Sequence, residues 1–309
     1  MIILKYIFII NPKAGKKDRH IEYENSIKSY FENRDDTYEI YLTEYPNHAT
    51  EIADKVCIEN EYCKIFVFGG DGTFNEVISG AYGHDNFSIG VFPSGTGNDF
   101  VKTLNSFDVS EISELIEGEE LCCDVMKAND QIGINICSSG FDAEVAKNVT
   151  KFKKFVSGNL AYTLSTFYCF ITKTKYNFKI TIDDKCFEGK YIFAIAANGR
   201  YYGGGFFPAP NAQLNDGLLD FILIKGVSRL KILNLIDLYR KGKHIGLDIV
   251  QELKGKKMTV ECKKPLSLNI DGEVKTVDKI DIEVLPSKIK LIKPCHQAHD
   301  LRPLSVPQV

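Results

Sequence analysis

The residues whose types and spacing best suit chemistry form a glycine-rich loop, Gly69-Gly-Asp-Gly-Thr73, directly after the apolar run Ile65–Phe68. Apolar residues then recur at helical spacing from Phe74 to Ala81, so the pattern predicts a strand, a glycine turn and the start of a helix. Glycines let the backbone approach a ligand closely, and the unpaired N–H groups of a helix N-terminus attract anions. The loop therefore suits a phosphate group.

Two further polar loops with glycines also follow apolar runs. Asn11-Pro-Lys-Ala-Gly15 follows Ile2–Ile10, and Pro93-Ser-Gly-Thr-Gly-Asn-Asp99 follows Phe87–Phe92. Ligands of open α/β sheets bind beyond the carboxyl ends of the strands, where such loops converge. Neither GxGxxG nor GxxxxGK[ST] occurs, so the three loops predict a nucleotide phosphate site outside the common Rossmann and P-loop types. The backbone expected to cradle the phosphates comprises Asn11, Pro12, Lys13, Ala14, Gly15, Gly69, Gly70, Asp71, Gly72 and Thr73, with Lys13 and Lys16 as countercharges.

Asp71 lies within the predicted phosphate turn, where its carboxylate would repel a phosphate unless a cation intervened. A metal ion or a metal-bound water at Asp71 is the simplest explanation. Asp99 and Asp124 are weaker candidates for the same metal network. Either could instead cap a helix or belong to a turn.

A second pair of carboxylates lies in Asn269-Ile-Asp-Gly-Glu273, at the end of the predicted strand Leu266–Ile270. The geometry of a strand and a turn could aim Asp271 and Glu273 in the same direction. An Asp-Gly dipeptide is equally typical of a hairpin turn with solvent-facing acids, and the residues alone favour that interpretation.

These motifs together resemble the diacylglycerol kinase catalytic-domain superfamily, in particular the soluble bacterial lipid kinases. The resemblance rests on the three glycine loops and on three later motifs, Asn198-Gly-Arg-Tyr-Tyr-Gly-Gly-Gly205, Pro208–Gly217 and Asn269–Glu273. It spans most of residues 1–294. Gly-Gly-Asp-Gly-Thr by itself is less specific, since NAD kinases and phosphofructokinases are similar there.

The resemblance implies roles for residues that spacing alone does not assign. It implies that Thr43 and Thr96 line an ATP site and that Glu273 is the general base, with Asp271 orienting it or sharing its role. A base beside a second carboxylate has a raised pKa, which suits proton abstraction near neutrality. The resemblance also implies a structural Mg²⁺ held by Gln213, Asp216 and Leu218, where the residues alone indicate only a turn.

The elements that must position these residues change character along the chain. Strand and helix patterns alternate up to about residue 118, which predicts a parallel sheet covered by helices. Short alternating segments follow, such as Phe178–Ile182 and Met258–Cys262, with helices near Phe155–Ile171 and Leu230–Tyr239. We therefore expect an α/β nucleotide-binding domain over residues 1–122, joined by a returning strand at 287–294. An antiparallel β-sandwich-like acceptor domain is expected over 123–286, and a tail over 295–309.

Charge divides the 309-residue chain in the same way. Residues 1–122 hold 10 basic and 22 acidic residues, whereas residues 123–309 hold 28 and 19. Basic clusters at 147–154, 240–243 and 254–257 are either ordinary solvated surface or a means of transient docking on an anionic membrane. A pI near 6.1 argues against nucleic acid as a partner. The expected location is the cytoplasm, with peripheral membrane association.

The sequence thus predicts an ATP- and Mg²⁺-dependent kinase that phosphorylates a lipid hydroxyl, with diacylglycerol as the first choice of acceptor. Phosphatidylglycerol, a sphingoid base and NAD remain alternative acceptors, and a non-catalytic nucleotide- or lipid-binding regulator is a third interpretation. Tyr201, Tyr202, Phe206 and Phe207 beside three glycines could form a mobile aromatic lip for an acyl chain or merely cover a core patch. Exposed edge strands of the second domain could pair two copies into a homodimer.

Overall fold

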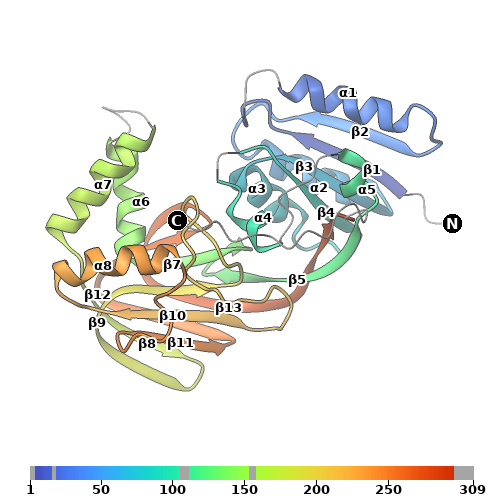
Figure 1. Ribbon diagram of the computed structural model, residues 1–309. Coiled ribbons are helices and arrows are strands. Elements are labelled where there is room, and N and C mark those ends of the chain that lie inside the picture. Colours follow the sequence, from blue (N-terminus) through green and yellow to red (C-terminus); the bar gives the residue numbers. More distant parts are fainter. Residues whose placement is uncertain (1–3, 16–18, 96, 105–110, 153–157, 296–309) are drawn as a thin grey trace.

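The computed structural model describes residues 4–15, 19–95, 97–104, 111–152 and 158–295 (Figure 1). The first part of the chain alternates strands with helices. These elements are β1 (Leu4–Ile10), α1 (Arg19–Phe31), β2 (Thr37–Leu42), α2 (His48–Glu59), β3 (Tyr62–Gly69), α3 (Asp71–Ala81) and β4 (Phe87–Pro93). The pairs β1–β2, β1–β3 and β3–β4 are all parallel, in the order β4-β3-β1-β2.

Side chains that alternate along these strands bury the sheet on both faces. Ile7 and Ile9 of β1 pack in a cluster with residues of α2 and α3, whereas Phe8 and Ile10 pack in another cluster with Tyr23, Ile27 and Phe31 of α1. Since successive strand residues point to opposite faces, helices must cover both sides of the sheet. All three glycine loops then leave the sheet at the carboxyl ends of their strands.

Short elements connect the two parts of the molecule. They are α4 (Asp99–Thr103), α5 (Ile112–Ile116), β5 (Glu119–Ala128) and β6 (Gln131–Gly133). The second part holds β7 (Ile136–Gly140), α6 (Phe141–Phe152), α7 (Gly158–Thr172), β8 (Tyr176–Ile182), β9 (Lys185–Ala197), β10 (Leu219–Lys225), α8 (Arg229–Arg240), β11 (Val250–Gly255), β12 (Lys257–Ile270) and β13 (Glu273–Lys293). Its strands pair antiparallel in the order β11-β10-β9-β7-β12-β13, and β8 pairs with both β9 and β12.

One long strand, β13, joins the two parts into a continuous sheet. Its residues Leu291 and Ile292 pair in parallel with Ile89 and Gly90 of β4. The alternating patterns predict two separate segments, Ile280–Val284 and Ile289–Ile292, but the structure joins them. The register of β13 against β5 shifts between Leu285 and Ile289, where Ser287 has a left-handed φ of 53°. A bulge thus absorbs the break that Pro286 introduces, because proline has no N–H for the ladder.

Helices α6, α7 and α8 lie together at the end of the molecule that is remote from α1 (Figure 1). The sequence patterns do not predict α6, which begins directly after β7 with no polar spacer. Gly140 permits this junction, since its φ is 121° and a Cβ there would lie 2.2 Å from the carbonyl oxygen of Ile192. None of the helices described is long and apolar enough to cross a bilayer.

Candidate active site

The three glycine loops converge at the carboxyl ends of β1, β3 and β4. The backbone N–H of Asn11 donates to Phe68 O at 2.9 Å, and that of Ser94 donates to Gly69 O at 3.1 Å. The Asn11 side chain also reaches the second loop, where its Nδ2 donates to Thr73 Oγ1 at 2.9 Å. The loops are therefore held against one another by backbone and short polar groups.

Glycine is required where these loops touch. Gly15 has a φ of +78°, and a Cβ on it would lie 2.6 Å from Ser94 O. A Cβ on Gly95 would lie 2.5 Å from the Cα of Gly70. Gly70 precedes α3 as its N-cap and offers no side chain to the first N–H groups of the helix. These N–H groups and the Cβ-free surface form a cradle suited to a phosphate.

The other residues predicted to bind the nucleotide lie around this cradle. The N–H of Ala14 donates to Asn11 O at 3.0 Å, and that of Lys13 donates to Asn11 Oδ1 at 3.0 Å, so the first loop is a closed turn with an exposed lysine side chain. Thr43 is buried beside the loop, and its N–H donates to Ile10 O at 2.9 Å. Pro12 lies within the turn, and Gly72 in the first turn of α3. Lys16 and Thr96 lie outside the described residues.

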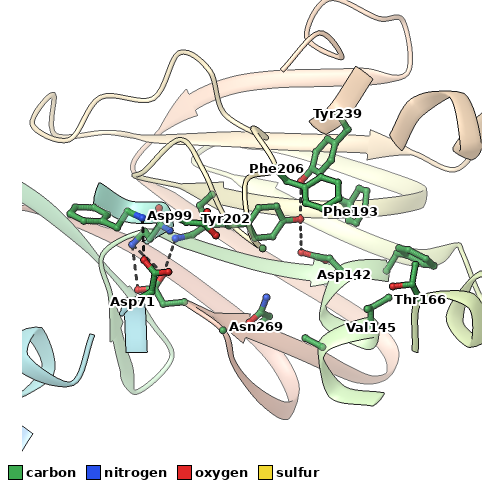
Figure 2. A pocket seen from close by; sticks show the side chains of 18 of the residues that line it. Asp71, Asp99, Asp142, Val145, Thr166, Phe193, Tyr202, Phe206, Tyr239 and Asn269 are labelled. Carbon is green, nitrogen blue, oxygen red and sulfur yellow. Dashed lines mark hydrogen bonds between the residues drawn. The ribbon is translucent and has the colours of Figure 1, made fainter. Parts of the chain in front are cut away.

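Three aspartates, Asp71, Asp99 and Asp271, line a single cavity, and Figure 2 shows Asp71 and Asp99 close together at one end of it. Burial raises the pKa of Asp71, although the N–H groups of Asp99 and Phe100 favour its charged form. The Phe100 N–H donates to Asp71 Oδ1 at 3.2 Å. The cradle and the cavity thus meet at Asp71, the first residue of α3.

Asp271 is the most constrained of these acids. Its carboxylate accepts hydrogen bonds from the N–H groups of Ile134 and Ile136 at 2.8 Å and of Asn135 at 3.1 Å. Burial raises its pKa to about 6 against these three donors, and the negative charge of Asp71 contributes to the rise. A carboxyl group with this pKa can be ionised and still accept a proton near neutrality.

The predicted catalytic pair does not point in one direction. Asp271 and Gly272 both have a positive φ and form the two-residue turn between β12 and β13, where Ile270 pairs with Glu273. This is the hairpin that the Asp-Gly dipeptide favours. Asp271 faces the cavity, whereas Glu273 is exposed, does not line the cavity and accepts a hydrogen bond from Gln131 Nε2 at 3.2 Å.

The rest of the cavity is mainly apolar and has a volume of about 350 Å³. Its walls come from β7, α6, α7, β9, the segment after β9, and α8, and include Ile136, Phe141, Val145, Ala146, Phe193, Phe206, Ile232, Leu235 and Ile236. Of the predicted aromatic lip, Tyr202 and Phe206 line the cavity, whereas Tyr201 stacks on Phe207 with ring centroids 4.3 Å apart. The walls suit a flexible apolar chain.

One polar cluster interrupts this apolar wall. The Tyr202 hydroxyl donates to Asp142 Oδ2 at 3.0 Å and lies 2.9 Å from the hydroxyl of Tyr239 (Figure 2). Burial raises the pKa of Asp142, while hydrogen bonds from Ser138 and Tyr202 favour its charged form. Sequence patterns give no signal for Asp142 or Tyr239, because one follows an unpredicted helix start and the other resembles a core position of α8.

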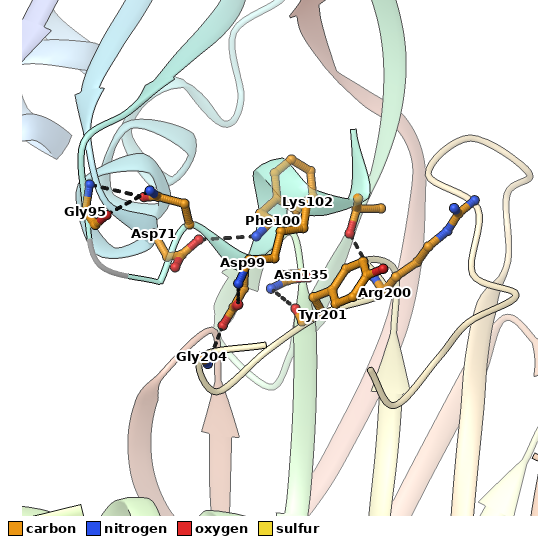
Figure 3. A network of polar contacts seen from close by, with 11 residues as sticks. Asp71, Gly95, Asp99, Phe100, Lys102, Asn135, Arg200, Tyr201 and Gly204 are labelled. Atoms are coloured by element: carbon orange, nitrogen blue, oxygen red, sulfur yellow. Dashed lines mark hydrogen bonds and ion pairs between the residues drawn. The ribbon is translucent and has the colours of Figure 1, made fainter. Parts of the chain in front are cut away.

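A polar network ties the third glycine loop to the segment after β9 (Figure 3). Asp99, at the first position of α4, pairs through Oδ1 with Lys102 Nζ at 2.7 Å and accepts at Oδ2 from the Gly204 N–H at 2.7 Å. The Arg200 N–H donates to Thr103 Oγ1 at 2.9 Å. These contacts fix the third glycine loop against the segment that carries Tyr202 of the cavity wall.

The chemistry of the acids at the cavity mouth fits a nucleotide-bound Mg²⁺. Among the described residues there is no group of three or more His, Cys, Asp or Glu that could hold a metal ion by itself. Mg²⁺ at kinase sites is bound by one or two carboxylates together with substrate phosphates and waters. Asp71 offers such a carboxylate beside the phosphate cradle.

At the predicted structural Mg²⁺ site, the carboxylate of Asp216 is paired with a lysine side chain. Asp216 Oδ2 pairs with Lys254 Nζ at 2.6 Å, and Asp216 Oδ1 accepts from the Leu218 N–H at 3.1 Å. A metal ion at this carboxylate would have to displace the Lys254 ammonium, so the donor set does not fit Mg²⁺ as it stands. Asp124 lies at the base of the same loop, where it accepts from the N–H groups of Gly217 and Ser287, both at 2.7 Å. Gln213 lies directly before the turn at Leu214 and Asn215.

Comparisons with known proteins agree with this geometry. Residues 5–128 match the model of the "Diacylglycerol kinase catalytic domain", and residues 135–293 match that of the "YegS C-terminal NAD kinase beta sandwich-like domain". A Staphylococcus aureus (strain Mu3) protein named "Putative lipid kinase" is 34% identical over 235 residues, which cover 74% of this chain and 76% of that protein.

Solved structures show the same architecture. The crystal structure of a "putative diacylglycerol kinase" from Bacillus anthracis strain Sterne is similar with a TM-score of 0.75 at 28% identity, covering 94% of this chain and 97% of that one. Another structure of that description from the same strain has a TM-score of 0.73 at 27% identity, covering 93% and 96%. The two-domain architecture with a β-sandwich-like C-terminal domain is thereby confirmed. The chain belongs to the diacylglycerol kinase catalytic-domain superfamily, among relatives named as lipid kinases.

Proposed function

We propose that the protein is an ATP- and Mg²⁺-dependent lipid kinase that transfers the γ-phosphate of ATP to the hydroxyl of diacylglycerol. One observation carries this proposal: the Cβ-free phosphate cradle lies next to a largely apolar cavity that Asp71 and the partly buried Asp271 line. A phosphate site beside an acyl-chain-sized cavity matches a reaction between a nucleotide and a lipid. Membership of the superfamily supports the same reaction class.

The proposed roles follow from position. The loops around Asn11–Gly15 and Gly69–Thr73 hold the phosphates, with Lys13 and Thr43 beside them. Asp71 would help to hold Mg²⁺, which when bound neutralises charge on the transferring phosphoryl group. We assign proton acceptance from the acceptor hydroxyl to Asp271, since it lines the cavity and burial keeps its pKa near 6. Glu273, which the family resemblance favours as base, remains the alternative.

Other acceptors are less well supported. The apolar wall of the cavity disfavours NAD, whose phosphates and sugars would lose hydration there without polar partners. Phosphatidylglycerol would bring a phosphate charge close to Asp71, Asp99 and Asp271, so its binding requires additional cations. A sphingoid base has an ammonium that Asp142 could accept, and it is the second candidate.

The test is incubation of the purified protein with γ-labelled ATP, Mg²⁺ and mixed micelles of one lipid at a time, followed by organic extraction. Label in the organic phase with diacylglycerol supports the proposal and identifies phosphatidic acid. Label appearing only with a sphingoid base would replace the acceptor. Absence of label with every lipid would reject the lipid-kinase proposal and favour a soluble acceptor or a regulatory role.

A further inference from the structure

Helices α7 and α8 carry apolar side chains on their solvent-facing sides. Phe167 is 62% exposed, Leu230 77% and Leu233 53%. Of the eleven large apolar residues that are exposed in the described part of the chain, seven lie on these two helices. We call these seven the docking face: Leu164, Phe167, Tyr168, Ile171, Leu230, Leu233 and Ile236.

The pattern of each helix shows that the exposure is regular. On α7 the exposed residues recur at i, i+3, i+4 and i+7, and the buried side is formed by smaller residues such as Ser165 and Cys169. On α8, Leu230, Leu233 and Ile236 are spaced three apart, while Ile232, Leu235 and Tyr239 face inward. Both helices are thus apolar on two sides, which is unusual for helices surrounded by water.

The two helices are joined where they meet. The guanidinium of Arg229, at the start of α8, donates to Phe170 O at 3.0 Å and to Ile171 O at 2.7 Å, at the end of α7. This contact satisfies carbonyl groups that have no partner within the helix. Helices α7 and α8 therefore meet at the end of the molecule remote from α1, and both carry an exposed apolar stripe there (Figure 1).

The docking face is continuous with the cavity. Thr166, between Leu164 and Phe167 on α7, lines the cavity, and Ile236 of α8 belongs to both the face and the cavity wall. The residues of α7 and α8 that line the cavity carry no charge, so an apolar chain that entered there from the face would meet no charged side chain of these two helices in the cavity. A water-soluble acceptor would gain nothing from such a path.

Basic side chains lie next to the docking face: Lys151 and Lys173 line a small surface pocket with Tyr168, and Lys231 follows Leu230. Lys151 of α6, Lys173 after α7, and Lys231 and Arg240 of α8 are exposed there. Asp237 is the exposed acid of α8, and it pairs with Lys241 at 3.0 Å. The predicted cluster at 254–257 is different, since Lys254 and Lys257 pair with Asp216 and Glu283. Lys153 and Lys154 lie outside the described residues.

The charge distribution distinguishes between the occupants of this face. A second copy on a two-fold axis would bring the same basic rim against itself, which is unfavourable. An anionic bilayer complements both features, because its acyl region accepts apolar side chains and its headgroups attract nearby cations. We propose that the docking face rests on an anionic membrane and that the acceptor enters the cavity between α7 and α8; the entry path rests on the proposed function.

The test is co-sedimentation of the protein with vesicles of phosphatidylcholine, with and without phosphatidylglycerol, in the absence of nucleotide. The variant is Phe167→Ser combined with Leu230→Ser, and the matched control is Ile58→Ser, whose side chain is 67% exposed on α2. We expect the double variant to lose at least tenfold in affinity for vesicles with phosphatidylglycerol, and the control to bind as the wild type does. Lys151→Glu with Lys231→Glu should weaken binding only to these anionic vesicles, with Lys28→Glu on α1 as control.

Several outcomes would overturn the proposal. The proposal is wrong if the wild-type protein binds neither kind of vesicle. It is also wrong if the double variant binds vesicles with phosphatidylglycerol as tightly as the wild type does. Conversion of a wild-type dimer to a monomer by the double variant, measured by sedimentation, would assign the face to a second copy. Turnover of short-chain diacylglycerol dispersed as monomers separates docking from chemistry. One combination of results would retain the docking proposal and reject the proposed function: the wild type shows no such turnover but binds vesicles, and the double variant does not bind them.

Discussion

The two halves of the candidate site, the phosphate cradle and the acceptor cavity, are formed by different parts of the residues, backbone in one and side chains in the other. The phosphate cradle is formed by backbone and by glycines that approach within a distance no Cβ would permit, as at Gly15 and Gly95. The acceptor cavity is formed largely by apolar side chains of β7, α6, α7, β9 and α8, and its polar groups include Asp71, Asp99, Asp271, Asp142, Tyr202 and Tyr239. The cradle should therefore be intolerant of added volume, whereas the cavity can change specificity one side chain at a time.

The largest expected effect is at the junction of the two halves. Asp271→Asn removes the proposed proton acceptor without changing its size, so turnover should fall on the order of 10²- to 10⁴-fold while ATP affinity changes little. Steady-state kinetics and nucleotide titration measure both. Glu273→Gln is the matched variant, and a loss confined to Glu273→Gln would transfer the role to Glu273.

The pH dependence of the same reaction sharpens the assignment. Asp271 must be deprotonated to accept a proton, and its pKa is raised to about 6. We expect kcat/KM to fall as the pH decreases through about 6, and this limb to be absent from the residual activity of Asp271→Asn. A wild-type profile that is flat from pH 5 to 7 would contradict the role of Asp271.

The second largest effect is expected from a substitution in the phosphate cradle. Gly15→Ala places a Cβ in the left-handed region and 2.6 Å from Ser94 O, so the loop must move. ATP affinity should fall about tenfold, which corresponds to about 1.4 kcal/mol. Gly72→Ala is the comparison for stability, because a Cβ at Gly72 would have no atom within 4 Å. The Tm of the Gly72→Ala protein should therefore not fall below that of the wild type. Unchanged ATP binding in Gly15→Ala would show that the cradle tolerates added volume.

A smaller effect is expected from a substitution in the wall of the acceptor cavity. Tyr202→Phe removes the hydroxyl that donates to Asp142 and should cost about 1 kcal/mol. The KM for the lipid acceptor should rise roughly fivefold, with the KM for ATP unchanged. Tyr201→Phe keeps the stacking on Phe207 and serves as control. Equal changes in both KM values would indicate that Tyr202 acts through the network at Asp99 rather than in the cavity.

The smallest effect on turnover is expected from His244, which contributes to the stability of the fold and does not line the cavity. His244 is buried, packs against Tyr239, and lies with Nε2 3.0 Å from Pro208 O. Burial lowers its pKa to about 4, so the unfolded state binds more protons between pH 4 and 6.5. The free energy of unfolding should therefore decrease as the pH falls through this window, by about 1–3 kcal/mol from this group. Denaturant titrations of wild type and His244→Asn should converge at pH 4, and a constant difference would contradict the assignment.

The difference between the halves also explains what the sequence could predict. A cradle of glycines in three contiguous loops leaves a signature in the chain, and the strands before Gly15, Gly69 and Ser94 carry an unambiguous apolar pattern. The cavity leaves none, because Asp142, Tyr202 and Tyr239 are far apart in the sequence and meet only in the folded state. The inward position of Asp271 and the outward position of Glu273 likewise depend on the turn at Asp271 and Gly272, which both have a positive φ.

Two local features were hidden for physical reasons. Helix α6 follows β7 without a spacer because Gly140 adopts a φ of 121°, a conformation that no periodicity reveals. Asp216 lies in the loop before β10, and its partner Lys254 belongs to β11, far along the chain. A turn motif that suggests a metal ligand therefore could not show that a cation from the same chain is already there. In the absence of nucleotide, adding Mg²⁺ or EDTA should accordingly leave the wild-type Tm unchanged.

Strand β13 has a consequence for how the protein is made. The sheet that begins with β1 gains its pairing with β13 only through Leu291 and Ile292, near the end of the described chain. During translation, the early strands are therefore complete on the ribosome while β4 still has an open edge. A nascent chain stalled before residue 285 would display that edge, and we expect it to be a client of chaperones where the full-length chain is not.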